Sequence, residues 1–194
     1  MKKVLVVVAS RHGATRGIAD RIARVLEAEG LHAAVVSAKA AKDVALADAV
    51  IVGSGVYMGS WLNDGVEFLE GHYPTLRMRP TWLFSSGPLK GSSAEKEGGS
   101  LEDALGPATG PGSGGRKRLE ALKDKIRARG HRSFYGAFDP SDGPKSITEG
   151  FVRILPASKG LLPAGDYRDW DAIEAWAHEI ATELKATVRS PVAV

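Results

Sequence analysis

The sequence contains no cysteine and no long apolar run. A chain without cysteine can form no disulfide, no thiolate nucleophile, and no cysteine-ligated zinc or iron–sulfur site. This composition fits a reducing compartment, so we expect a cytoplasmic protein. No apolar stretch reaches the roughly 20 residues of a membrane span, so we expect no transmembrane segment. The apolar run near the start covers only Val4 to Ala9, which favours a core strand over a signal peptide.

A dominant charge of one sign is also missing. The 194 residues include 26 Lys and Arg and 23 Asp and Glu, which gives a formal net charge of +3 and a pI near 9.2. A nucleic-acid-binding protein would concentrate its basic residues in a dense stripe, whereas these are scattered, so we expect no nucleic-acid partner. With 43% hydrophobic and 25% charged residues, the composition is typical of a globular domain.

The chain alternates apolar segments with segments of helical periodicity. Val4–Val8 is apolar at every position, which is typical of a central strand buried on both faces of a parallel sheet. Thr15–Glu29 then repeats apolar residues at helical spacing and is followed by Gly30, a typical helix end. Further strands are predicted at 33–37, 49–53, 81–85 and 132–138, and further helices from about Leu62, over 116–129 and after Asp169. These elements predict an α/β fold, a doubly wound five-stranded parallel sheet.

We expect a single domain over residues 1–188, followed by a short tail over 189–194. Residues 90–115 are dominated by Gly, Ser, Pro, Glu and Lys, which predicts a long mobile loop after the fourth strand. Pro74 and Pro80 bracket the expected end of the helix between the third and fourth strands.

Three loops of unusual composition follow predicted strands: Ser10–Thr15, Ser54–Trp61 and Ser85–Leu89. In doubly wound sheets a ligand lies beyond the carboxyl ends of the strands, where the strand order reverses. With the strand order 2-1-3-4-5, strands 1, 3 and 4 are neighbours, so the three loops converge on one crevice. The first loop leads into the positive end of a helix, where backbone N–H groups bind anions.

The first loop distinguishes among phosphate ligands. A dinucleotide site needs three spaced glycines and an acidic residue after strand 2, but the turn has only Gly13 before the helix, and strand 2 ends in Ser37. No Gly-Lys-Ser/Thr sequence follows, which argues against a P-loop. A phosphoryl-accepting receiver domain needs an aspartate where strand 3 has Gly53. Of the phosphate sites considered, this leaves a mononucleotide phosphate, held by Ser10, Thr15 and backbone amides. The open alternative is that Ser10 and Thr15 simply cap the following helix.

Ser10-x-His12-Gly13-x-Thr15 resembles the Thr/Ser-x-Thr-Gly-x-Thr phosphate loop of flavodoxins, whose cofactor is FMN. Within that superfamily the chain is most similar to the flavodoxin-like, menaquinone-dependent protoporphyrinogen IX dehydrogenases. The residues that carry this finer resemblance are Arg11, Gly13, Thr15, Arg16, Ile18, Ala19, Asp166–Trp170 and Glu179–Ala181. The chain departs from the pattern at His12, which replaces a hydroxyl or acidic residue. It also departs in its Gly/Ser-rich long loop, where the haem-pathway enzymes carry a more basic and aromatic insertion.

The flavodoxin resemblance implies roles for the three loops. Tyr57 and Trp61 would stack on the flavin ring, with a core anchor as the alternative role for Trp61. The implied FMN-binding residues are Ser10, Arg11, His12, Gly13, Ala14, Thr15, Ser54, Gly55, Val56, Tyr57, Met58, Gly59, Trp61, Ser85, Ser86, Gly87, Pro88 and Leu89. The redox chemistry would belong to the flavin, so we expect no catalytic side chain and no metal ligand.

The resemblance implies an FMN-dependent oxidoreductase that transfers electrons or hydride between the reduced flavin and a quinone or porphyrinogen-type substrate. Two alternatives stay open: a flavodoxin-type electron carrier without its own substrate, and a flavin-free binding module on the same fold. Shuttle flavodoxins are typically acidic, so the basic pI disfavours the carrier. The resemblance leaves open a homodimer and peripheral contact with the inner face of a membrane. A predicted amphipathic helix over Ile147–Leu155 would either rest on that membrane or dock on the sheet.

Overall fold

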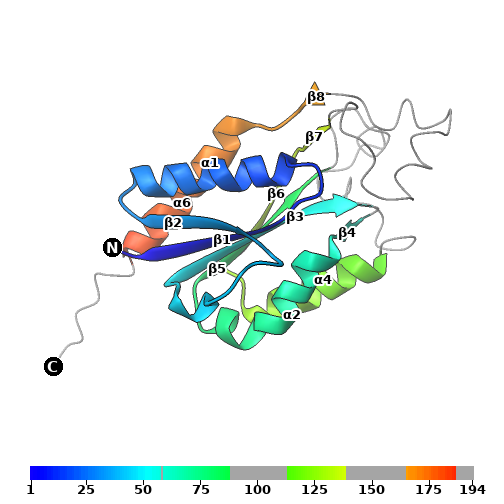
Figure 1. Cartoon of the computed structure of the whole chain (residues 1–194), viewed down its shortest axis with the longest axis horizontal. Helices are drawn as coiled ribbons and strands as arrows, with labels where there is room; N and C mark the ends of the chain where they lie inside the picture. The colour runs from blue at the N-terminus through cyan, green and yellow to red at the C-terminus, as the bar shows by residue number, and fades with distance from the viewer. Residues whose placement is uncertain (58, 88–112, 139–164, 187–194) are drawn as a thin grey trace.

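The computed structural model describes residues 1–57, 59–87, 113–138 and 165–186 (Figure 1). The parallel strands of its central sheet are β1 (Lys3–Ala9), β2 (His32–Ser37), β3 (Ala49–Tyr57), β5 (Thr81–Ser86) and β6 (Gly130–Phe134). Their spatial order is β2-β1-β3-β5-β6, which is 2-1-3-4-5 when these strands are numbered along the chain. The predicted doubly wound sheet and its strand order are therefore confirmed.

Helices cover both faces of the sheet (Figure 1). One face carries α1 (Ala14–Ala28) and α6 (Trp170–Ala186), and the other carries α2 (Asn63–Arg77) and α4 (Ser113–Ile126). Neighbouring residues of β1 divide between the two cores, because successive side chains of a strand point to opposite faces. Val6 packs in the core with α1 and α6, whereas Val7 packs in the core with α2 and α4. Burial on both faces explains why β1 is apolar throughout.

The strand register aligns the carboxyl ends of the central strands. Ala9 of β1 pairs with Ser54 of β3, Ser54 pairs with Ser85 of β5, and Ser85 pairs with Ser133 of β6. The chain therefore leaves β1, β3 and β5 at the same edge of the sheet. This confirms the expected convergence of the three loops for the residues that the structure describes.

The second loop differs from its prediction. β3 continues four residues beyond the predicted strand end, to Tyr57, and the chain then returns as β4 (Ser60–Trp61). Val56 pairs with Trp61 and Tyr57 pairs with Ser60, so the predicted glycine-rich loop is an antiparallel hairpin. The small residues Ser54 and Gly55 stay in strand conformation because β5 pairs with both of them.

The predicted fifth strand at 132–138 is wrong at both ends, since β6 spans Gly130–Phe134. Its ladder with β5 stops at Phe134 because β5 itself ends at Ser86. The next residues form a separate antiparallel pair, in which β7 (Ala137–Phe138) lies beside β8 (Gly165–Asp166).

The helices mostly follow their predicted positions. α1 lies within one residue of its prediction, and α2 ends at Arg77, between Pro74 and Pro80. α4 begins three residues before its prediction and also ends three residues early, because Arg127 adopts a left-handed conformation with φ 56°. α6 begins after Asp169, whose carboxylate accepts the N–H of Ala172 at 2.9 Å as an N-cap.

Several predictions lie outside the described residues and stay predictions. They concern Met58, Pro88, Leu89, most of the loop over 90–115, the helix over Ile147–Leu155 and the tail over 189–194. Among the helices of the described ranges, none combines the length and apolar character that crossing a membrane requires.

Candidate functional site

The first loop ends at the N-terminus of α1. Gly13 is the N-cap residue and has φ 88°, a left-handed conformation that glycine adopts at little cost. Ser10 Oγ accepts the N–H of Gly13 at 3.1 Å, so this hydroxyl holds the loop and not the first turn of the helix. Within the described residues α1 has no side-chain cap and no acidic residue in its first turn. The predicted capping alternative is therefore not what the structure shows, and the positive helix end faces the loop.

The first and second loops meet at Gly55. A Cβ atom on Gly55 would lie 3.2 Å from Cε2 of Tyr57 and 3.3 Å from Oγ1 of Thr15. These contacts are closer than ordinary packing, which gives a physical reason for glycine at this position. The buried Thr15 hydroxyl of α1 and the Tyr57 ring of β3 are therefore neighbours across a backbone without a side chain.

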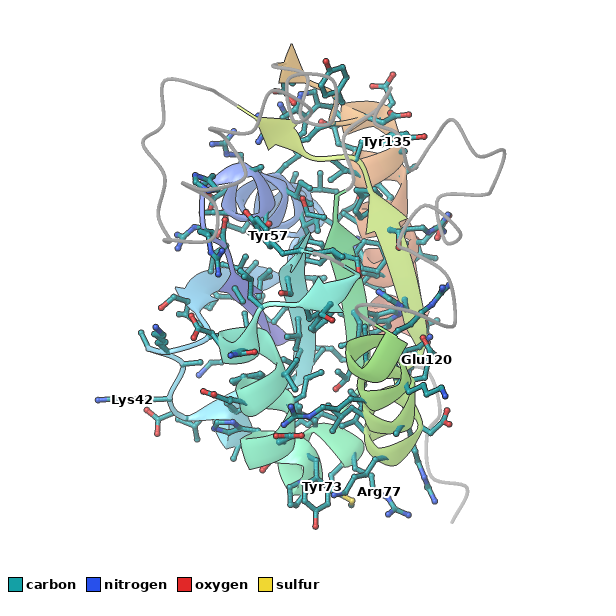
Figure 2. All side chains as sticks on the ribbon, turned by 90° about the vertical axis from the view of Figure 1, so that its right-hand side faces the viewer. Lys42, Tyr57, Tyr73, Arg77, Glu120 and Tyr135 are labelled. Atoms are coloured by element: carbon teal, nitrogen blue, oxygen red, sulfur yellow. The ribbon has the colours of Figure 1, made fainter. Side chains whose placement is uncertain are left out.

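Tyr57 is the aromatic residue that the hairpin exposes, with 36% of its surface accessible. The guanidinium of Arg11, from the first loop, lies over the Tyr57 ring at 4.7 Å from its centroid. Figure 2 shows Tyr57 between α1 and β4, in agreement with its contacts to both loops. The site thus places a positive charge and an accessible ring beside the N-terminus of α1.

Trp61 lies below this surface and is 5% exposed. It packs with α2 and α4, and its Nε1–H donates a hydrogen bond to Ser85 Oγ at 2.8 Å. The alternative role of a core anchor describes this position, while stacking of Trp61 on a ring stays a prediction. The hydroxyl of Ser54 has a similar structural task, because it accepts the N–H of Leu62 at 3.1 Å and holds the turn from β4 into α2.

The third loop begins at Gly87, which has φ 116°. Its N–H donates to the carbonyl of Phe134 at 2.9 Å, and a Cβ there would lie 3.5 Å from the carbonyl oxygen of Val56. The described start of this loop therefore lies beside the hairpin. Ser85 and Ser86 are both buried, and the Ser85 hydroxyl is already engaged with Trp61.

His131 of β6 was not predicted as a site residue. Its Nε2 lies 2.8 Å from Ser85 Oγ. Burial lowers the pKa of His131 to about 4, with a further contribution from the positive charge of Lys123 and partial opposition from Glu120. His131 could have been predicted as a polar strand residue that lies on the same face of the sheet as Ser85. That prediction requires the pairing register of β5 and β6, which the sequence alone leaves undefined.

Arg168 also lies at the first loop without having been predicted there. Its Nη1 donates to the carbonyl of Ala14 at 3.4 Å, and its guanidinium pairs with Asp166 at 2.6 and 2.8 Å. The hydrogen bond from Arg168 holds the pKa of the Asp166 carboxyl below its usual range. The same guanidinium lies over the ring of Trp170, 4.4 Å from its centroid. These contacts fasten the segment before α6 to the start of α1.

The comparison with known families now decides the classification. Residues 5–140 match the family described as Flavodoxin domain. The chain belongs to the flavodoxin domain family. FMN is the cofactor of this family, so membership supports the predicted cofactor. The flavodoxin part of the predicted resemblance is confirmed, and its dehydrogenase part stays a prediction.

Solved flavodoxin structures share this fold. A flavodoxin from Pseudomonas aeruginosa, a point mutant, aligns with a TM-score of 0.55 and 17% identity over 94% of this chain and 99% of its own. A flavodoxin from Streptococcus pneumoniae gives a TM-score of 0.54 and 16% identity over 93% of this chain and 99% of its own. At identities this low, the structural similarity is evidence for the fold alone.

A longer protein contains the same fold. The rubredoxin oxygen:oxidoreductase of Desulfovibrio gigas aligns with a TM-score of 0.56 and 16% identity over 97% of this chain. This chain spans only 37% of the length of that oxidoreductase. The comparison with curated proteins gives no significant match.

The described residues fit the phosphate and ring of FMN. The uncapped first turn of α1 and the left-handed Gly13 leave backbone N–H groups for a phosphate, and the Thr15 hydroxyl lies beside them. The close approach of Thr15 and Tyr57 at Gly55 brings a phosphate-binding element and an aromatic ring together. FMN carries a phosphate and a flat ring in one molecule, so this pairing suits it.

Proposed function

We propose that this protein is an FMN-dependent oxidoreductase that transfers electrons or hydride between its flavin and a quinone or porphyrinogen-type substrate. The main support for flavin binding is that the Thr15 hydroxyl and the Tyr57 ring come close together at Gly55. The substrate class is supported by the resemblance to the menaquinone-dependent dehydrogenases, which rests on Arg11, Gly13, Thr15, Arg16, Ile18, Ala19, Asp166–Trp170 and Glu179–Ala181. We further propose a cytoplasmic location.

Phosphate binding is assigned to the first loop. The N–H groups at the start of α1 donate to the phosphate, and the hydroxyls of Ser10 and Thr15 add side-chain donors. The helix end favours negative charge without needing a cation. Arg11 lies at the same edge and adds a positive charge over Tyr57, which strengthens the field for an anion.

Ring binding is assigned to the hairpin. Tyr57 offers an accessible aromatic face, and stacking of this kind adds about 1 kcal/mol beyond the burial of surface. When FMN is bound, it supplies the redox chemistry. The protein side chains bind and orient the cofactor, and the buried Trp61 and Ser85 support the hairpin from below.

An electron carrier without its own substrate is the second candidate. The exposure of Tyr57 favours it, because a flavin stacked on this ring would lie near the surface, where it could exchange electrons with another protein on contact. The net charge of +3 and the pI near 9.2 disfavour a carrier that docks on basic partners, since like charges slow the encounter. Such a carrier would instead dock on an acidic redox partner.

A titration with FMN tests the flavin assignment. The purified protein is mixed with FMN, and the fluorescence and visible spectrum of the flavin are recorded. Quenching with a perturbed spectrum is expected, because a stacked and buried ring changes both. Absence of binding would exclude both the oxidoreductase and the carrier, and it would favour a flavin-free binding module.

Turnover then separates the enzyme from the carrier. The FMN-loaded protein is mixed with protoporphyrinogen IX as electron donor together with a menaquinone analogue as electron acceptor and, in a separate reaction, with the quinone and an excess of a chemical reductant of the flavin. Multiple turnovers of either compound are expected for the proposed oxidoreductase. A single exchange of electrons without turnover would support the carrier.

A further inference from the structure

Two hydrogen bonds connect the hairpin to the neighbouring strands. The Trp61 Nε1–H of β4 donates to Ser85 Oγ of β5 at 2.8 Å, and Ser85 Oγ lies 2.8 Å from His131 Nε2 of β6. The Trp61 and His131 rings also meet edge to face, with their centroids 6.1 Å apart. Side chains from β4, β5 and β6 thus form one continuous polar contact inside the protein.

The direction of the first hydrogen bond follows from its chemistry. An indole N–H can only donate, so the Ser85 oxygen is the acceptor from Trp61. Ser85 Oγ keeps one proton, and we assign His131 Nε2, 2.8 Å away, as the acceptor of that proton. Accepting there requires a neutral imidazole with its proton on Nδ1. The low pKa of His131 agrees with a neutral ring at neutral pH, and the charged groups of α4 that influence it are Lys123 and Glu120.

The hydrogen-bonded side chains of Trp61, Ser85 and His131 border a cavity. A space of about 380 Å³ is lined by Trp61, Ser85 and His131, and on its other side by residues of α4 that include Glu120 and Lys123. Figure 2 shows Glu120 on α4, the helix that forms this wall. Trp61 is 5% exposed and packs with residues of α2 and α4, but the part of its indole that borders this space has fewer packing partners. The hydrogen bond to Ser85 adds a directional contact at that part of the ring.

The anchored indole is directly connected to the candidate flavin surface. Trp61 pairs with Val56, and Ser60 pairs with Tyr57, within the short β3–β4 hairpin. A shift of Trp61 would therefore move the backbone that carries Tyr57. The Tyr57 ring in turn touches the position of Gly55 beside Thr15.

We propose that Ser85 and His131 are positioning residues for the flavin. Through the indole of Trp61 they hold the β3–β4 hairpin, and with it Tyr57, in place at the FMN site. The flavin part of this inference rests on the proposed function. The anchoring of the hairpin is a property of the protein alone and is tested without flavin.

Hydrogen exchange of the flavin-free protein tests the anchor. Ser85→Ala removes both hydrogen bonds, and His131→Phe removes the one between Ser85 and His131. His131→Gln keeps an amide oxygen that can still accept the Ser85 proton. His178→Phe, on the exposed face of α6, is the matched control. Amides of residues 56, 57 and 59–62 should exchange about fivefold faster in the first two variants, the factor expected for one lost hydrogen bond. They should exchange at wild-type rates in His131→Gln and His178→Phe.

Flavin measurements on the same proteins test the positioning. Ser85→Ala and His131→Phe should change the visible circular dichroism of bound FMN and shift its midpoint potential, with His131→Gln restoring both. Trp61→Phe keeps an aromatic ring but lacks the indole N–H donor, so it should behave like Ser85→Ala. It replaces Ser85→Ala or His131→Phe in these measurements if either of them fails to fold.

The outcomes separate the two proposals. Wild-type exchange in the hairpin of Ser85→Ala and His131→Phe would overturn the anchor, whether or not FMN binds. Faster hairpin exchange with unchanged circular dichroism and potential of bound FMN would overturn the positioning role. Failure of the wild-type protein to bind FMN would overturn the proposed function and the positioning role with it, while the exchange experiment would still decide on the anchor.

Discussion

Replacing His131 by glutamine should remove a pH dependence of folding stability. The imidazole is largely but not fully buried beside Ser85 of β5 and close to Lys123 of α4, and both conditions disfavour its protonated form. Protonation would also convert Nε2 into a donor, so it could no longer accept the Ser85 hydroxyl. Glutamine retains an acceptor for Ser85 but does not titrate.

The magnitude follows from the two pKa values. The imidazole protonates near its ordinary pKa of 6.5 in the unfolded chain but at a pKa of about 4 in the folded protein. Between these values the unfolded state binds more protons, so stability is complete above pH 6.5 and falls as the pH drops toward 4. From pH 7 to pH 5 this group should lower the free energy of unfolding by about 2 kcal/mol, or the Tm by about 4 to 8 °C at this chain length.

The assay is urea unfolding of the wild-type protein and of His131→Gln at pH 7, 6 and 5, with circular dichroism as the measure of unfolding. The wild-type protein should lose about 2 kcal/mol more than His131→Gln over this range. The other four histidines are present in both proteins, so their contribution cancels. Equal losses, or an NMR titration of His131 with a midpoint near 6.5, would refute the reasoning.

Three further substitutions test the site and the fold. Thr15→Ala should weaken FMN binding about 10-fold or more by removing a hydroxyl beside the phosphate loop, whereas Thr182→Ala on exposed α6 should leave it unchanged. Gly55→Ala should also weaken FMN binding, measured by the same fluorescence titration, because its Cβ would press on Tyr57 and Thr15. Asp169→Ala should lower stability by about 1 kcal/mol in urea unfolding by removing the N-cap of α6, with FMN affinity unchanged.

Each of these substitutions has a result that contradicts it. Wild-type FMN affinity in Thr15→Ala would remove this hydroxyl from the site. Wild-type affinity in Gly55→Ala would mean that the contact between the first two loops does not shape the cofactor site. An unchanged urea midpoint in Asp169→Ala would mean that solvent satisfies the first turn of α6 equally well.

Local patterns predicted the central elements well. The uniformly apolar β1 and the periodic α1 depend on interactions that repeat every two or every 3.6 residues, so a short stretch of sequence contains the whole signal. Gly13 and the serine and threonine around it predicted the turn into α1 for the same reason, since a helix terminus is a local structure, and the anion site at that turn stays a prediction.

Patterns failed where a partner far along the chain decides the structure. Ser54–Tyr57 contains small and polar residues that suggest a loop, yet pairing with β5 and β4 keeps it extended. The predicted fifth strand begins at residue 132, but the register with Trp82 and Leu83 adds Gly130 and His131 to it. Arg168 reaches the first loop across 154 positions of sequence, which no local pattern contains.

The sequence by itself determined the doubly wound fold and the flavodoxin resemblance, because these depend on local periodicity and on a short motif, and it predicted a phosphate loop at Ser10–Thr15. Only the tertiary structure decided which aromatic residue is accessible. Tyr57 and Trp61 lie on the same hairpin, and the strand pairing with Ser60 and Val56 exposes the first and buries the second. The surroundings of His131 were decided in the same way, since only the pairing of β6 with β5 brings its ring to Ser85 and its partial burial near Lys123 of α4 lowers its pKa.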